Sequence, residues 1–306
     1  MKKVALIFPG QGSQTVGMGR ELYDTNPTAR AIFDQAEQVI PGLLDVIFNG
    51  PEDKLKETAY CQPAIVTVSV AALKAFEQSE QYSTVTPVFA CGHSLGELSA
   101  LVACGALSFE AVINLVQKRA ACMQKAAEAN PGKMAAVIGV EASVLLDICR
   151  DNGSEVANFN SLDQIVITGA ADKVDATCKV LEAQGARVIP LAVSGGFHSS
   201  LMKSAADEFQ IYVDQTDFAM PKFPLLCNVD ATPTTDISEI KFNLPKQIYS
   251  SVFWVDTIQT IVSAGVTDFI EIGPGTVLKG LLRKIDKSLS VQNIRTPEDI
   301  AAIQNS

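Results

Sequence analysis

Residues 87 to 104 of the chain, PVFACGHSLGELSALVAC, place a glycine-bracketed serine between two apolar runs. The pattern predicts a short buried strand, a tight turn and a helix, with Ser94 at the apex of the turn. Gly92 and Gly96 fit this interpretation, because the strand and helix backbones crowd together at such a turn. The stretch therefore predicts a nucleophile elbow, around which the rest of the chain is arranged.

An elbow would give Ser94 the surroundings of a nucleophile. Its hydroxyl is expected to point into solvent, and the N–H of Leu95 to point at any carbonyl that Ser94 attacks. The positive end of the following helix would lie beneath the developing oxyanion, and Glu97 suits that helix terminus. The alternative is a serine in an ordinary strand-to-helix loop, since the five-residue pattern also occurs by chance.

Composition excludes several classes of protein. The chain has 306 residues, of which 47% are hydrophobic, and a net charge of -10. It can therefore bury a large core in one or two domains, and its acidity argues against nucleic-acid binding. No apolar run of the sequence suggests a membrane span, and Val4 to Phe8 is too short for the core of a signal peptide. We expect a cytoplasmic protein without membrane contact.

The seven cysteines are scattered along the chain and never spaced as C-x-x-C. An odd number without such pairs argues against a disulfide framework and against a zinc site. We therefore expect reduced, mostly buried thiols, and neither a metal nor a redox cofactor.

The first apolar run is followed by a glycine-rich loop, Pro9 to Gln14. A dinucleotide fingerprint would need a third glycine or an alanine at position 15, which is a threonine. The loop can still present backbone N–H groups to a ligand. Further on, Pro63 predicts the first turn of a long apolar helix over residues 64 to 76, and residues 40 to 60 are expected to be irregular.

A second helix is expected from a cap at Ser108 to about Glu128. Its apolar side chains fall on one face in a helical projection, and Arg119 lies in the middle of that face. A buried guanidinium needs an anionic partner, because an unpaired buried charge is strongly destabilising. An internal Asp or Glu and a substrate carboxylate are the two alternatives.

Residues 134 to 193 predict the order strand, helix, strand, strand, helix, strand. This βαββαβ order is typical of a ferredoxin-like domain, and Glu-Ala-Asn-Pro-Gly at 128 to 132 is a fitting linker before it. Elsewhere strands and helices alternate as in an α/β sheet. We expect one domain made of residues 1–130 and 197–306, with a small domain of residues 131–196 inserted into it.

A nucleophilic serine needs a base, and the chain has two histidines, His93 and His198. Neighbouring side chains on a tightly turned backbone project apart, so His93 is poorly placed to serve Ser94. His198 remains by elimination, although it follows Ser194-Gly-Gly-Phe197, which looks like an exposed loop where a histidine is usually only solvated. No Asp or Glu stands out as a third member, but a backbone carbonyl can orient a histidine instead.

Several motifs, in their order along residues 4 to about 290, resemble those of the malonyl-CoA:acyl carrier protein transacylases. They are Phe-Pro-Gly-Gln-Gly-Ser-Gln (8–14), Gln-Pro-Ala (62–64), Gly-His-Ser-Leu-Gly-Glu (92–97), Arg119, Asn-Phe-Asn-Ser (158–161), Gly-Phe-His (196–198) and Gly-Pro-Gly (273–275). The resemblance implies an α/β-hydrolase-like large domain with a ferredoxin-like insert, and an active site in the gorge between them.

The resemblance also implies roles for five residues. Ser94 would be the acyl-accepting nucleophile, His198 its base and Arg119 the clamp for the free malonyl carboxylate, which a guanidinium can grip through two hydrogen bonds. The backbone N–H groups of Leu95 and Gln11 would form the oxyanion hole.

Other matching positions carry smaller roles. The main-chain carbonyl of Gln247 would orient His198. Phe197 matches a pattern associated with malonyl rather than methylmalonyl selection, although Gly195-Gly196 departs from the bulkier residue that is often seen there. Asn160 and Gln62 are further candidates for substrate contact.

The function that the resemblance implies is a ping-pong transfer of malonyl from malonyl-CoA to the phosphopantetheine thiol of an acyl carrier protein. Fatty acid biosynthesis is the expected setting, with a discrete polyketide-synthase acyltransferase as an alternative, and a monomer is the expected state. Carrier proteins are acidic, so docking would need basic residues, and the candidates are Lys279, Arg283, Lys284 and Lys287. The alternative is that these residues form only a solvated helix face.

Two other functions remain open. A serine thioesterase or hydrolase would share the elbow and the base but would use water as the acceptor, and it has no evident use for Arg119. A carrier-binding scaffold without turnover is disfavoured by the presence of Ser94, His198 and Arg119 together.

Overall fold

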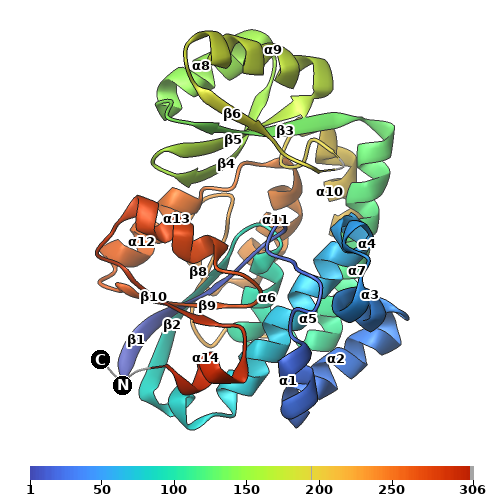
Figure 1. The fold of residues 1–306 in the computed structure, drawn as a ribbon, viewed down its shortest axis with the longest axis vertical. Helices are drawn as coiled ribbons and strands as arrows, with labels where there is room; N and C mark the ends of the chain where they lie inside the picture. Colours follow the sequence, from blue (N-terminus) through green and yellow to red (C-terminus); the bar gives the residue numbers. More distant parts are fainter. Residues whose placement is uncertain (194, 304–306) are drawn as a thin grey trace.

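The structure, a computed structural model, describes residues 1–193 and 195–303. Its larger sheet has six strands in the order β10-β9-β1-β2-β7-β8, and Figure 1 shows it in the lower half of the molecule. The strands are β1 (Lys2–Phe8), β2 (Val85–Gly92), β7 (Leu225–Leu226), β8 (Pro233–Thr234), β9 (Asp268–Ile272) and β10 (Ser290–Ile294). Every neighbouring pair is parallel except β7 with β8. The α/β fold class is confirmed.

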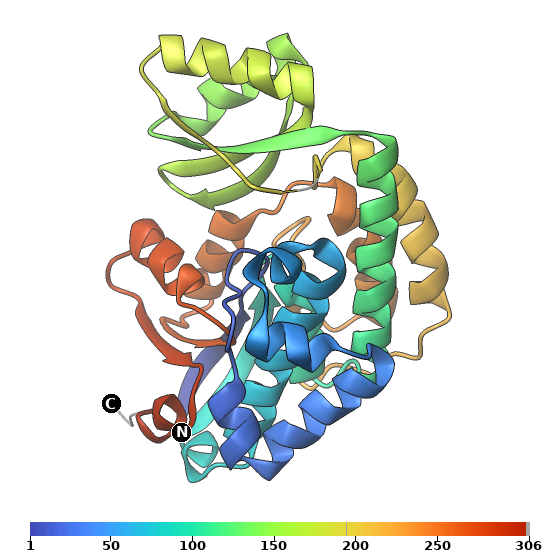
Figure 2. The same ribbon diagram turned by 45° about the vertical axis from the view of Figure 1, so that its right-hand side comes forward.

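Helices cover both faces of this sheet (Figures 1 and 2). Along β1, Leu6 and Phe8 pack into the core formed with the helices that precede and follow β2, whereas Ala5 and Ile7 pack against two helices near the C-terminus. Burial on both faces explains why β1 is continuously apolar from Val4 to Phe8 rather than alternating. On the first face lie α1 (Arg20–Thr25), α2 (Pro27–Val39), α3 (Leu43–Asn49), α4 (Glu52–Lys56), α5 (Thr58–Glu77), α6 (Gly96–Ala103) and α7 (Phe109–Ala129), and on the second α12 (Trp254–Ser263) and α13 (Val277–Ile285).

The expected start of the helix at Pro63 is wrong. Helix α5 begins at Thr58 and carries Pro63 in its interior, and the segment before it, which we expected to be irregular, contains α3 and α4. Burial on every side of α5 outweighs the local preference of proline for a first turn. Within the described residues α5 alone is long and apolar enough to cross a membrane, but 83% of its most apolar window is buried inside the fold. It is a core helix.

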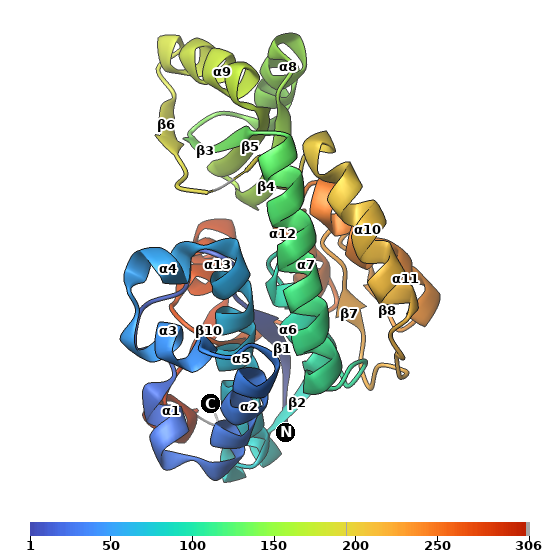
Figure 3. The same cartoon turned by 90° about the vertical axis from the view of Figure 1, so that its right-hand side faces the viewer.

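The second sheet has four antiparallel strands in the order β4-β5-β3-β6. Its elements are β3 (Gly132–Ile138), α8 (Ala142–Asn152), β4 (Glu155–Ser161), β5 (Gln164–Ala170), α9 (Ala171–Ala183) and β6 (Arg187–Pro190). Both helices lie on the face turned away from the larger sheet (Figure 3). The order and the directions are those of a ferredoxin-like unit, as predicted. The domain boundaries at residues 131 and 196 stay a prediction.

The chain crosses between the two sheets along α7, which rises to β3 (Figure 3). It returns through η2 (Ser200–Met202) and α10 (Lys203–Asp214), and later through α11 (Ile237–Lys246) and η3 (Gln247–Tyr249). Main-chain hydrogen bonds also join the two parts: Val252 donates to the Ala157 carbonyl over 2.8 Å, and Phe159 donates to the Val252 carbonyl over 3.0 Å. The segment after η3 therefore pairs with the edge strand β4 through a parallel bridge between Asn158 and Val252.

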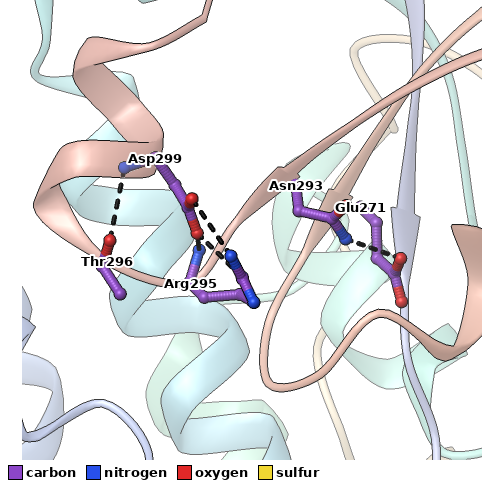
Figure 4. A network of polar contacts seen from close by, with 5 residues as sticks. All are labelled: Glu271, Asn293, Arg295, Thr296 and Asp299. Carbon is purple, nitrogen blue, oxygen red and sulfur yellow. Dashed lines mark hydrogen bonds and ion pairs between the residues drawn. The ribbon is translucent and has the colours of Figure 1, made fainter.

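A buried carboxylate ties β9 to its neighbours. Glu271 accepts hydrogen bonds from the N–H groups of Leu278 (3.0 Å) and Lys279 (2.9 Å) at the start of α13, and from the Asn293 side chain (2.7 Å) on β10. Figure 4 shows the contact with Asn293. Beside it, Arg295 bonds to Asp299, which lies on α14 (Pro297–Ala301). Burial raises the pKa of Glu271. This acid stabilises the sheet edge, far along the chain from the elbow.

Candidate active site

The predicted strand, turn and helix are present at the elbow. Strand β2 ends at Gly92, α6 begins at Gly96, and Ser94 between them has a φ of 50°, in the left-handed region. A Cβ at Gly92 would collide with the Gly96 backbone, and one at Gly96 would collide with the Phe8 carbonyl. Both positions therefore require glycine. The Ser94 side chain is half-buried rather than in open solvent.

Ser94 lines a cavity of about 330 Å³ between the two sheets. The walls come from the glycine-rich loop after β1, the elbow, α7, the strands β3 and β4, and the segment after β6. The cavity is lined by most of the predicted site residues: Ser94, His198, Arg119, Gln11, Leu95, Gln62 and Phe197. A gorge between the two parts of the fold is where the resemblance led us to expect the site.

Ser94 and His198 form a hydrogen-bonded pair. Ser94 Oγ lies 2.8 Å from His198 Nε2, and on the other side of the ring Nδ1 lies 2.8 Å from the Gln247 carbonyl and 3.2 Å from the Ser250 carbonyl. A carbonyl only accepts, so Nδ1 carries the proton and Nε2 is free to accept the serine O–H. Burial, followed by the charge of Arg119, lowers the pKa of His198 to about 3. The imidazole is therefore neutral at physiological pH, and its unprotonated Nε2 faces the serine hydroxyl.

The expectation that His198 follows an exposed loop is wrong. Residues 195–198 are buried, and the side chain of His198 is 5% exposed. The Phe197 carbonyl accepts from the Thr168 hydroxyl of β5 over 2.8 Å, and the His198 N–H donates to the Ile248 carbonyl of η3 over 3.1 Å. The loop is thus held between the small sheet and η3, contacts that the local sequence does not reveal. Ser194, the first residue of that predicted loop, lies outside the described residues.

Arg119 is buried on the apolar face of α7 without an acidic partner. Its Nη1 donates to Gln62 Oε1 (2.9 Å), and its Nη2 donates to Gln247 Oε1 (3.0 Å) and to Ser94 Oγ (3.2 Å). Its Nε is buried without a partner in the part of the chain that is described. No described carboxylate forms an ion pair with it, which argues against the internal salt bridge. Burial lowers the pKa of Arg119 to about 10, so the guanidinium is still charged at neutral pH.

His93 points away from the nucleophile, as the sequence led us to expect. Its Nε2 lies 2.7 Å from Asn160 Oδ1, and its ring packs edge-on against Trp254 with centroids 5.5 Å apart. Asn160 therefore holds His93 and is not among the residues that line the cavity. Gln62 lines the cavity beside Arg119.

Sequence reasoning missed Asn228 and the inward role of Glu97. Asn228 Oδ1 accepts from the Ser94 N–H over 2.6 Å, and its Nδ2 donates to the Gly92 carbonyl over 2.7 Å, so one side chain holds both ends of the turn. Glu97 accepts from the Asn228 N–H over 2.8 Å. Asn228 is 134 residues from Ser94 and has no local signal. Glu97 is a lone acid in an apolar run, and this position could have indicated a buried polar contact.

These observations define a class of enzyme. A serine on an elbow with a neutral histidine base forms acyl-enzymes, and a charged arginine within reach of the serine hydroxyl suits an acyl group that carries a carboxylate. The fold and the site are thus those of a serine acyltransferase of the α/β type.

Comparison with known proteins gives the family. Residues 5–301 match the acyl transferase domain family. The malonyl CoA-acyl carrier protein transacylase of Bacillus subtilis is 42% identical over 307 residues, which cover 98% of this chain and 96% of the relative. The chain belongs to the malonyl CoA-acyl carrier protein transacylases.

Solved structures agree with this assignment. The acyl-carrier-protein-S-malonyltransferase of Bartonella henselae superimposes with a TM-score of 0.93 at 37% identity, covering 99% of this chain and 98% of that one. A malonyl-transacylase in complex with its type II PKS acyl-carrier protein also gives a TM-score of 0.93, at 34% identity, covering 99% of each chain.

Proposed function

We propose that this chain transfers a malonyl group from malonyl-CoA to the phosphopantetheine thiol of an acyl carrier protein, through a malonyl-Ser94 intermediate. The observation that carries the proposal is the charged, buried Arg119, which donates to Ser94 Oγ over 3.2 Å and has no acidic partner among the described residues. A carboxylate on the acyl group would supply the missing anion. The names of the relatives, which are malonyl transacylases, support the same reaction.

The transfer takes place in two half-reactions. Ser94 Oγ attacks the thioester carbonyl and gives its proton to His198 Nε2, the C–S bond breaks, and the proton passes to the leaving CoA thiolate. In the second half, the carrier thiol gives its proton to His198 as its sulfur attacks the acyl-serine carbonyl, the ester C–O bond to Ser94 breaks, and the proton returns to Ser94 Oγ. The hydrogen bond from Nδ1 to the Gln247 carbonyl, 2.8 Å long, keeps the ring in the required tautomer throughout.

We propose further roles for the residues around the cavity. The backbone N–H groups of Gln11 and Leu95, both beside the cavity, would stabilise the oxyanion. Phe197 lines the cavity and would limit the space beside the acyl group, favouring malonyl over the branched methylmalonyl. Gln62 accepts a hydrogen bond from Arg119 Nη1, so its role would be to hold the guanidinium in place.

The nearest alternative, a serine hydrolase, differs in the fate of the acyl-enzyme. When the protein is incubated briefly with malonyl-CoA and analysed by intact-protein mass spectrometry, we expect a gain of one malonyl group. The adduct should persist without a thiol and disappear when a phosphopantetheinylated carrier protein is added. Acetyl-CoA is the matched control, which should load poorly. Continuous release of CoA without an adduct would instead make water the acceptor and support the hydrolase.

We also propose that basic residues around α13 dock the acidic carrier protein. Arg283, Lys284 and Lys287 are all exposed, but Lys284 Nζ lies 3.5 Å from Asp163 Oδ1, so part of its charge is neutralised within the protein. The double change Arg283→Glu with Lys287→Glu is expected to raise KM for the carrier about tenfold, because exposed charges mainly affect the rate at which two proteins associate. Loading with malonyl-CoA should be unchanged.

The control for this prediction is Lys3→Glu with Lys179→Glu, an equal change of charge at two exposed lysines outside α13. It should leave both half-reactions unchanged. If the α13 variant and the control raise the carrier KM equally, net charge rather than a docking surface is responsible.

We place the reaction in fatty acid biosynthesis. The likeness to a transacylase bound to a polyketide carrier keeps a discrete polyketide-synthase acyltransferase as the alternative, because the transfer itself is the same in both settings. A cytoplasmic location and a monomeric state stay predictions. Activity with the carrier proteins of the two pathways, compared at equal concentration, would separate the settings.

A further inference from the structure

Gln247 lies at the centre of a buried polar network behind the cavity. Its side-chain oxygen accepts from Arg119 Nη2 over 3.0 Å, and its side-chain nitrogen donates to Glu97 Oε2 and to the Ser94 carbonyl, both over 2.9 Å. Gln247 and Glu97 are each 1% exposed, and neither lines the cavity. Neither side chain therefore touches a substrate in the cavity, and direct contact is left to the residues that they hold.

The partners on the two sides of the Gln247 amide differ in kind. The Arg119 guanidinium can only donate hydrogen bonds, whereas the Glu97 carboxylate and the Ser94 carbonyl can only accept them. One orientation of the amide satisfies both sides. In the opposite orientation the NH₂ group would face the guanidinium, and buried donors and acceptors on both sides would lose their partners, which is costly.

We propose that Glu97 is a positioning residue for Arg119, holding the Gln247 amide so that the guanidinium stays directed at the carboxylate of the acyl group. The inference rests on the proposed function, because it concerns the preference for malonyl over acetyl. Glu97 is itself fixed by the Asn228 N–H over 2.8 Å, and Asn228 holds the elbow. The same network thus connects the nucleophile and the carboxylate clamp.

A competing interpretation is that Glu97 acts only as a counter-charge to Arg119. The two interpretations predict opposite signs. If Glu97 is a counter-charge, neutralising it would leave Arg119 more attractive to an anionic acyl group, and the preference for malonyl would increase. If Glu97 is a positioning residue, neutralising it would let the amide and the guanidinium reorient, and the preference would decrease.

The ionisation of Glu97 makes a test possible without a mutation. Burial raises the pKa of Glu97 to about 7, although hydrogen bonds from Asn228 and Gln247 and the charge of Arg119 oppose the shift. Protonation below this value neutralises the carboxylate and weakens the hydrogen bond that Glu97 Oε2 accepts from Gln247. Other titratable or charged groups lie around Glu97 or in the adjacent site: Arg119, Asp230, Cys91, Cys227, His198 and His93.

Most of these groups keep one charge between about pH 5.5 and pH 8.5. The pKa of His198 is lowered to about 3 and that of Arg119 to about 10, and burial raises the pKa of the thiols of Cys91 and Cys227. The malonyl carboxylate is ionised throughout this range, as carboxyl groups are above about pH 5. Any contribution of His93 is common to the native chain and to a Glu97 variant, so their difference reports on Glu97.

The experiment measures kcat/KM for adduct formation with malonyl-CoA and with acetyl-CoA across this pH range. For the native chain, the malonyl-to-acetyl ratio is expected to fall about tenfold as the pH is lowered, the effect of one charge-assisted hydrogen bond. For Glu97→Gln, which keeps the shape of the side chain but removes the charge, the ratio at about pH 8.5 should be about tenfold lower and independent of pH.

The matched control is Glu271→Gln. Glu271 is also a fully buried acid in a network of hydrogen bonds, but it ties β9 to α13 and, through Asn293 (Figure 4), to β10. Its loss should lower stability and leave the malonyl-to-acetyl ratio and its pH dependence as in the native chain. A reduced ratio in both variants would mean a general loss of structure and would overturn the proposal.

Other outcomes are equally decisive. A ratio for Glu97→Gln that equals or exceeds that of the native chain overturns the positioning role. If Glu97→Gln does not fold, a flat pH profile of the native chain still overturns the proposal. Failure of the native chain to form any malonyl adduct would refute the proposed function itself, and the two failures are therefore distinguishable.

Discussion

Replacing Ser94 by alanine is expected to abolish the malonyl adduct and to lower the rate of transfer by about 10⁴-fold or more. The reason is geometric: Ser94 Oγ is the atom that lies 2.8 Å from the neutral His198 base and 3.2 Å from Arg119. The cavity, the helix terminus and the oxyanion donors would remain, so malonyl-CoA should still bind. Intact-protein mass spectrometry and single-turnover kinetics check this prediction.

The control is Ser99→Ala, on α6, the helix that follows the elbow. Ser99 is fully buried, and its hydroxyl has no hydrogen-bond partner among the residues that the structure describes. Its removal should therefore leave adduct formation unchanged. If Ser94→Ala is still acylated at the native rate, another side chain is the nucleophile, and the assignment of the elbow is wrong.

Replacing Arg119 by alanine is expected to lower the malonyl-to-acetyl ratio of kcat/KM about 10³-fold. A site built to bind a charged group rejects ligands that lack it because its own polar groups are then left unpaired, and the loss of the guanidinium removes this discrimination. Gln62 and Gln247 would also lose their donors at 2.9 Å and 3.0 Å. Arg119→Lys should recover little, because a point charge cannot replace the planar fork.

In Arg119→Ala, kcat/KM should decrease mainly for malonyl-CoA. Acetyl loading depends on Ser94 and His198, and removing Arg119 also removes a charge that lowers the pKa of His198, so that the base should strengthen. Lys118→Ala, at the neighbouring exposed position on α7, is the control and should change neither rate. An unaltered preference for malonyl in Arg119→Ala would exclude the carboxylate clamp.

Local rules were sufficient for much of this fold. The glycines at 92 and 96 predicted the elbow, since no other residue fits there, and the period of the apolar residues predicted α7 with Arg119 on its buried face. The ferredoxin-like unit followed from the order of its elements. Pro63 was misjudged because the burial of α5 on all sides outweighs a local preference.

The sequence by itself therefore determined the α/β class and predicted the nucleophile and the base, because these depend on backbone sterics and on the small number of histidines. Only the tertiary structure decided what surrounds them. His198 is buried because β5 and η3 close on its loop, and Arg119 has amide partners instead of an acid. Asn228 meets Ser94 across 134 residues. Such contacts depend on how the chain packs, and hydrogen bonds between distant segments have no local signature in the sequence.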